Sequence, residues 1–174
     1  MSANPARAAS GGSTYIGKWL IWVRCQGVET CWGAVRSATE AGSLGIAAKI
    51  RAHRAEGIDA STAKATDELT FSDLLPPAER HVVCVYTRDW RDVDDVGRVG
   101  RALAQIGAVR SEIIRYKSDE QTLSGIYYGG RQSVSLYEMR APYTRLAPGA
   151  GLRSDWLRDR HGPDVARILT LLGP

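Results

Sequence analysis

The chain has 174 residues, a hydrophobic content of 44% and a formal net charge of +4. This length suits one domain with a sizeable core, and no run of about 18 apolar residues is present to form a transmembrane helix. The mild positive charge permits an anionic partner without requiring one. Composition therefore predicts a globular domain with no membrane span. It does not determine what kind of partner the protein binds.

Residues 1–14 are rich in Ala, Ser and Gly and lack the apolar core of a secretion signal, so we predict a flexible N-terminal tail. The three cysteines, Cys25, Cys31 and Cys84, are odd in number and lack metal-ligand spacing. We interpret them as thiols in a reducing compartment. We expect the protein to be cytoplasmic and to bind neither a metal nor a cofactor.

The first half of the chain begins with a run of β-forming residues after Gly17. Apolar residues then recur at helical spacing from Val28 to Ala38, and Gly42 is a typical helix stop. The pattern predicts a strand at 17–23, a helix at 28–41, a strand at 44–53, a long loop at 54–79 and a strand at 81–87.

In the second half, Asp92 is a candidate helix cap with Asp95 three positions later, where the helix dipole favours an acid. Gly107 is placed to end that helix. Further elements are predicted as strands at 112–117, 126–128 and 133–137, a helical turn at 118–124, and a short helix at 163–172 that begins with Pro163.

This order contains too few helices to cover both faces of a parallel sheet. A mainly antiparallel sheet with helices on one face fits better, so the predicted fold class is α+β. We expect a single domain over residues 15–140, followed by a C-terminal extension at 141–174 that carries the short helix.

Basic side chains on one face of the predicted sheet are the sharpest feature of the sequence. Successive side chains of a strand point to opposite faces, so every second residue of the strands at 44–53 and 112–117 falls on the same side. If the helices cover the aliphatic face, the other face carries Lys49, Arg51, His53, Arg115 and Lys117, with Lys18 and Tyr137 as further candidates.

Lysine is rare in this chain, with only four among 23 basic residues, so each lysine is a candidate for a special role. Clustered cations repel unless solvent or an anion screens them, and phosphate suits both the arginine fork and the lysine ammonium. A solvated face, a phospho-ligand or nucleotide site, and a nucleic-acid interface all stay open, the last the least favoured. Arg88 and Trp90 follow a strong strand, where Trp90 could stack on a base or pack against the next helix.

Several short motifs together resemble a known family. They are Gly17-Lys-Trp-Leu-Ile, Cys31-Trp, the segment 38–49, Val83-Cys-Val-Tyr-Thr-Arg-Asp89, Asp95-Val, Tyr116-Lys-Ser-Asp119 and Ser135-Leu-Tyr137. This set resembles the poorly characterised family of the basophilic-leukaemia-expressed protein, over residues 15–139. The family is similar in fold to the cap-binding initiation factor 4E, and its bacterial members carry the label of a phosphothreonine lyase domain. The resemblance implies a curved antiparallel sheet with helices on its convex side.

The lyase label implies elimination of phosphate from a phosphorylated Ser or Thr in a peptide or protein. Lys49 or Lys117 would be the base and His53 the acid, with Arg51, Arg88 and Arg115 holding the phosphate and Lys18, Tyr137 and Trp90 as further ligand contacts. Two alternatives stay open: a non-catalytic module that binds a nucleotide, RNA or a phosphopeptide, and a protein-interaction domain. Cap recognition itself is not expected, because the sequence offers no matched aromatic pair.

Overall fold

The computed structural model describes residues 15–51, 80–126 and 134–173. The tail at 1–14, the loop at 54–79 and most of the strand predicted at 126–128 lie outside these ranges. The helices and strands are β1 (Gly17–Arg24), α1 (Val28–Glu40), β2 (Ala47–Ile50), β3 (Arg80–Thr87), α2 (Val93–Gln105), β4 (Ile113–Ser118), α3 (Asp119–Leu123), β5 (Tyr137–Arg140), β6 (Leu146–Pro148) and α4 (Asp155–Leu172).

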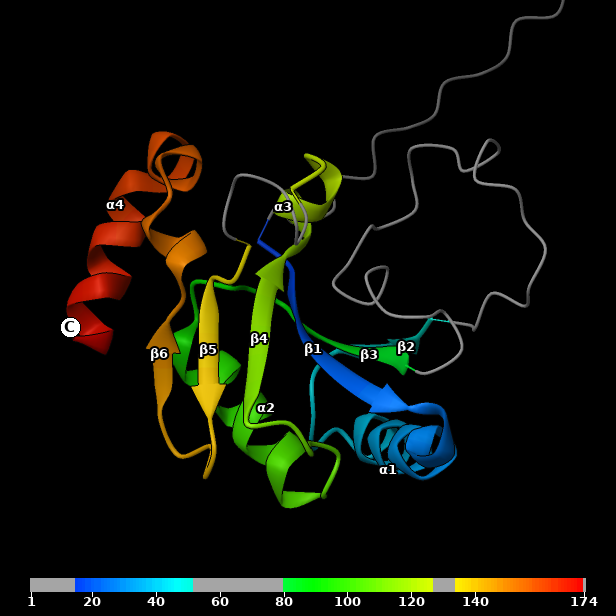
Figure 1. Cartoon of the computed structure of the whole chain (residues 1–174). Coiled ribbons are helices and arrows are strands. Elements are labelled where there is room, and N and C mark those ends of the chain that lie inside the picture. Colours follow the sequence, from blue (N-terminus) through cyan, green and yellow to red (C-terminus); the bar gives the residue numbers. More distant parts are fainter. Residues whose placement is uncertain (1–14, 52–79, 127–133, 174) are drawn as a thin grey trace, which may run out of the picture.

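The strands form one curved, unclosed sheet. Within the described ranges the sheet has six strands in the order β2-β3-β1-β4-β5-β6, and every neighbouring pair is antiparallel. The two edges are β2 and β6, and α4 lies alongside β6 (Figure 1). The predicted α+β class with an antiparallel sheet is confirmed.

One face of the sheet is packed against the helices. Trp19 of β1 is fully buried there, and its indole nitrogen donates to the carbonyl oxygen of Val96 in α2 at 3.0 Å. The same core contains buried side chains from β1, β3 and three helices: Ile21, Val83, Val85, Val35, Val99, Leu103, Leu157, Val165 and Ile168. Apolar side chains at alternate strand positions thus fix which face the helices cover.

The helix α2 begins and ends as its sequence predicts. The side chain of Asp92 accepts a hydrogen bond from the backbone N–H of Asp95 at 3.0 Å, which satisfies one N–H of the first turn. Gly107 follows the helix with φ at 71°, a conformation that few residues other than glycine adopt. These local signals fix where α2 begins and ends, and so they determine the length of the turn between β3 and α2.

The C-terminal region differs from the prediction. The strand expected at 133–137 lies at Tyr137–Arg140, and β6 pairs with it. The last helix begins at Asp155, capped by Ser154, whose side chain accepts a hydrogen bond from the N–H of Leu157 at 3.3 Å, and the helix predicted from Pro163 is its second segment, which follows a kink at His161. Backbone geometry at His161 interrupts α4, because proline lacks an N–H and crowds the preceding turn. Residues 141–173 therefore add a strand and a helix to the same sheet and core.

An ion-pair cluster fastens α4 to the turn after β3. Arg91 contacts Asp89 at 2.7 Å and Asp164 of α4 at 3.3 Å, and its guanidinium lies 3.3 Å from the ring centre of Tyr15. Burial alone would raise the pKa of Asp89, but the hydrogen bonds and charge of Arg91, helped by Arg167, outweigh it and hold that pKa below its ordinary value. The folded state therefore favours ionised Asp89.

We expect Asp89→Asn to lower stability at neutral pH and to reduce the loss of stability in acid. A carboxyl group whose folded pKa is depressed stabilises the fold above its unfolded pKa of about 3.9, and that contribution disappears as pH falls through the folded value. Urea unfolding of both proteins at pH 7, 5, 4 and 3 measures this. The difference in free energy of unfolding between the wild type and Asp89→Asn should become smaller below about pH 4. A difference in free energy of unfolding that stayed constant with pH would contradict a stabilising role of ionised Asp89.

Within the described ranges, no helix is long and apolar enough to cross a bilayer.

Candidate functional site

The pairing registers place the predicted basic residues on the sheet face that the described helices leave uncovered. Lys18 lies opposite Tyr86 and Lys117, Lys49 lies opposite Cys84, and Leu20 lies opposite both Cys84 and Arg115. Opposed residues of an antiparallel ladder point to the same face. Arg51 follows β2 and continues its pairing, with its N–H donating to the Val82 oxygen at 3.1 Å. We call the surface that carries Lys18, Lys49, Arg51, Arg115 and Lys117 the cationic face.

Lys18 and Lys117 form the most buried part of the cationic face. They are direct cross-strand partners on β1 and β4, and they are only 2% and 3% exposed. Like charges directly opposite one another destabilise a sheet, and burial strengthens their repulsion. This pair therefore requires a local arrangement of charge that offsets the repulsion.

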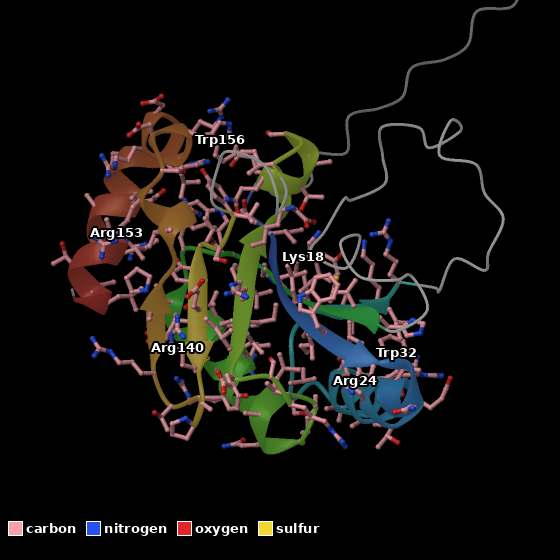
Figure 2. All side chains as sticks on the ribbon, in the orientation of Figure 1. Lys18, Arg24, Trp32, Arg140, Arg153 and Trp156 are labelled. Atoms are coloured by element: carbon pink, nitrogen blue, oxygen red, sulfur yellow. The ribbon has the colours of Figure 1, made fainter. Side chains whose placement is uncertain are left out.

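Asp119 supplies a counter-charge to this pair. Its Oδ1 lies 2.9 Å from the Lys18 ammonium, and among the described residues that oxygen accepts no hydrogen bond of good geometry, so the contact acts through charge. The position of Asp119 follows from the chain around it. Ser118 caps α3 in a reciprocal capping box with Gln121, and the Asp119 N–H donates to the Ile16 oxygen at 2.8 Å. The start of α3 is thereby held against the start of β1, where Figure 2 shows Lys18.

An aromatic ring lies between two of the lysines. The ammonium groups of Lys18 and Lys49 are each 5.4 Å from the ring centre of Tyr86, within the range of a cation–π attraction. Next to this ring, Leu20, Val82 and Cys84 form a small buried cluster of their own. The cationic face is therefore amphipathic, with cations around an apolar and aromatic centre.

The opposite side of the face is formed by β4 and β5. Arg115 contacts Glu138, its cross-strand partner, at 3.2 Å, and the Arg115 side chain is 39% exposed. Glu138 also lies 3.8 Å from Arg140. Among the described residues, Asp119 and Glu138 offset part of the positive charge, and both hold a cation in place.

Two of the predicted site residues, Trp90 and Tyr137, do not lie on the cationic face. Trp90 is fully buried in the helix-covered core, where its ring contacts those of Tyr15 and of His161 in α4. Arg88 is exposed in the turn after β3. Tyr137 lies opposite Tyr116 on the core side, so its predicted place on the open face is wrong. His53 lies outside the described residues.

The environment of Tyr137 explains why it belongs to the core. Its hydroxyl donates to the Trp90 carbonyl oxygen at 2.7 Å, and its ring contacts that of Tyr116. Burial first, and then the nearby carboxylate of Asp89, raise the pKa of Tyr137 far above its ordinary value. The hydroxyl therefore stays protonated and connects β5 to the turn after β3.

Sequence reasoning missed three contributors to the face: Tyr86, Asp119 and Glu138. Tyr86 alternates with Val82 and Cys84 along β3, so the period-two pattern contained its signal. The contact of Asp119 with Lys18 joins residues far apart in the sequence and depends on the pairing of β1 with β4. Glu138 could not be placed before the register of β5 was known.

The arrangement suits an anion more than a metal ion. Guanidinium groups donate in a fork that matches phosphate, and ammonium groups add mobile positive charge. No group of three or more His, Cys, Asp or Glu side chains that could hold a metal occurs within the described part of the chain.

Comparison with known proteins identifies the family. No curated protein matches the chain. The family described as Basophilic leukemia-expressed protein Bles03 matches residues 3–123, which cover β1 to α3 and hence Lys18, Lys49, Arg51, Arg115, Lys117 and Asp119. Because this match spans more than half of the 174 residues, the chain belongs to the Bles03 family.

Proposed function

We propose that the protein binds a phosphorylated ligand on the cationic face, and that its chemistry is elimination of phosphate from phosphothreonine or phosphoserine in a peptide or protein. The observation that carries the proposal is the register of β1 and β4, which sets two buried lysines side by side with Arg115 two residues along the same face. Such a set matches the charge and donors that a phosphate dianion needs.

In the elimination, a lysine amine removes the Cα proton of the phosphorylated residue. The electron pair of that C–H bond forms the Cα=Cβ double bond, the Cβ–O bond breaks, and phosphate leaves with its electrons. Lys117 or Lys49 is the base, whereas Lys18, Arg51 and Arg115 stabilise the charge on the departing phosphate. His53 is the acid of the proposal and lies outside the described residues.

The spacing of the aromatic side chains favours a phosphopeptide over a nucleotide base held between two rings. Trp22 lies opposite Val82, four residues along β3 from Tyr86, so the two positions are about 13 Å apart along the strand. Rings that sandwich a base must lie about 7 Å apart. Cap recognition in the manner of initiation factor 4E is therefore not part of the proposal.

The test uses a phosphothreonine peptide, ³¹P NMR and mass spectrometry. Elimination releases phosphate and leaves a dehydrated residue, whereas hydrolysis leaves threonine, so the peptide mass separates the two reactions. We expect Lys117→Met to abolish turnover and weaken binding. Arg36→Gln is the matched control, because Arg36 is a cation on α1 that pairs with Glu40 and is 64% exposed.

Binding that weakens with salt and with each lost cation, but without phosphate release from the wild type, would assign a non-catalytic phospho-ligand module. Binding unchanged in Lys18→Met, Lys117→Met and Arg115→Gln would refute the cationic face as a ligand site and favour a protein-interaction domain.

A further inference from the structure

A groove between α2 and α4 lies on the helix side of the sheet, away from the cationic face. It consists of two hollows of about 380 and 420 Å³ that share Val93, Asp94 and Leu171. Both volumes fall within the range of ligand pockets, about 300–1,000 Å³. Along α4 the lining positions Asp164, Arg167 and Leu171 recur at helical spacing, so one face of this helix lines both hollows. The hollows therefore form one continuous surface, which we call the α2–α4 groove.

The middle of the α2–α4 groove is mainly apolar. Val93 and Leu171 line both hollows, and Leu146 of β6 and Leu172 line the hollow nearer the end of α4. Leu171 is 60% exposed, and it is one of three large apolar side chains that are exposed within the described ranges. Covering it with an apolar group is favourable, because this removes apolar surface from water. The middle of the groove thus offers a place for an apolar side chain of a partner.

The two ends of the groove differ in charge. The end beside the turn after β3 is lined by four aspartates and two arginines: Asp89, Asp92, Asp94, Asp164, Arg91 and Arg167. Arg91 is already paired with two of these aspartates. This end therefore has a surplus of negative charge. The other end is lined by Arg101 and Arg145, with Asp94 at the boundary that both hollows share.

Arg101 is the cation of the basic end that is available to a ligand. It is exposed, and among the residues that the structure describes it forms no ion pair or hydrogen bond. Its side chain lies back along α2, where Gly97 leaves room for it: a Cβ at Gly97 would be 3.1 Å from a guanidinium nitrogen of Arg101. Arg145 instead donates to the carbonyl oxygen of Leu172 at 3.1 Å. An acidic group that enters the groove would therefore pair with Arg101.

We propose that the α2–α4 groove binds a short peptide segment of a partner protein, in which an apolar residue lies between an acidic end and a basic end. The apolar side chain packs on Leu171 and Val93, the acidic end pairs with Arg101, and the basic end meets Asp94 and the neighbouring aspartates. Opposite charges at the two ends fix the direction of the segment, because a reversed segment would bring like charges together. The proposal is independent of the phospho-ligand site on the cationic face.

The test selects peptides from a random phage-displayed library on the wild-type chain, with inorganic phosphate in excess to compete for the cationic face. We expect the enriched peptides to share an apolar residue with acidic residues on one side and basic residues on the other. Fluorescence anisotropy then measures the affinity of an enriched peptide. Leu171→Ser should weaken binding about tenfold, through loss of apolar contact. Arg101→Glu and Asp94→Lys should each weaken it about threefold to tenfold.

Two comparisons separate a ligand contact from a loss of structure. Leu123→Ser is the matched control for Leu171→Ser, because Leu123 is 88% exposed on α3 and lines neither hollow, so it should leave the affinity unchanged. The second comparison uses an enriched peptide whose acidic residues are replaced with lysine. This peptide should bind Arg101→Glu at least about threefold more tightly than it binds the wild type, because the opposite charges are then restored.

Enriched peptides that bind the wild type, Leu171→Ser and Arg101→Glu equally well would overturn the proposal, as would a library that yields no peptide of the expected pattern. Sedimentation of the protein alone tests a second copy of the chain as the occupant. A dimer that dissociates in Arg101→Glu would assign the groove to that copy and refute the partner peptide. Lys117→Met and Arg115→Gln should leave peptide binding unchanged, so the groove and the phosphate site can fail separately.

Discussion

Replacing Gly100 with alanine is expected to lower the free energy of unfolding by about 1–3 kcal/mol, as overpacking of a tight core does. A methyl group at this position of α2 would collide with the Met139 sulfur and lie 2.8 Å from the indole ring of Trp19. Neither neighbour can move easily, because both are fully buried and the Trp19 nitrogen is hydrogen-bonded to Val96. The collision outweighs the gain of about 1 kcal/mol that alanine normally brings to a helix interior.

Gly33→Ala is the matched control, because Gly33 lies within α1 and nothing comes within 4 Å of its expected methyl group. This variant should gain up to about 1 kcal/mol and melt about 3 °C higher, whereas Gly100→Ala should melt several degrees lower. Thermal unfolding of the three proteins side by side gives the comparison. Equal shifts of the same sign would show that helix propensity, and not packing of α2 on β1, controls both positions.

The cationic face was largely predictable because the pleat of a strand forces alternation. Once β2 and β4 were recognised, Lys49 and Arg51 had to share a face, as did Arg115 and Lys117. Alternation alone does not reveal which face a strand turns to the helices. For Tyr137 that choice depends on its pairing with Tyr116, a contact distant in sequence, and the prediction was wrong.

The C-terminal third was the hardest to predict for a related reason. Its strands are only four and three residues long, too short for a clear period, and their place depends on the pairing of β5 with β4 and of β6 with β5. The cap of Ser154 was a local signal for the start of α4. The predicted helix began instead at Pro163, a residue typical of a helix start, which here follows the kink at His161. Local chemistry thus predicted elements better than it predicted contacts such as that between Lys18 and Asp119.

Replacing Asp119 with asparagine is expected to tighten the binding of inorganic phosphate by about threefold to tenfold at low ionic strength. The carboxylate lies 2.9 Å from the Lys18 ammonium, so it competes with an incoming anion for that charge and also repels the anion. Asparagine removes both effects at nearly constant shape. The same change should lower stability, because Lys18 and Lys117 lose a counter-charge in a buried site.

Isothermal titration with phosphate measures the affinity, and Glu120→Gln is the matched control. Glu120 is the next residue of the same helical turn, but its carboxylate contacts His161 at 2.7 Å and Arg160 at 3.8 Å, and neither belongs to the cationic face. The gain from Asp119→Asn should shrink as salt rises, since screening weakens the repulsion that the carboxylate exerts. Weaker phosphate binding in this variant would reverse the role of Asp119: its contact would then orient Lys18 for the ligand, and the competition would be negligible.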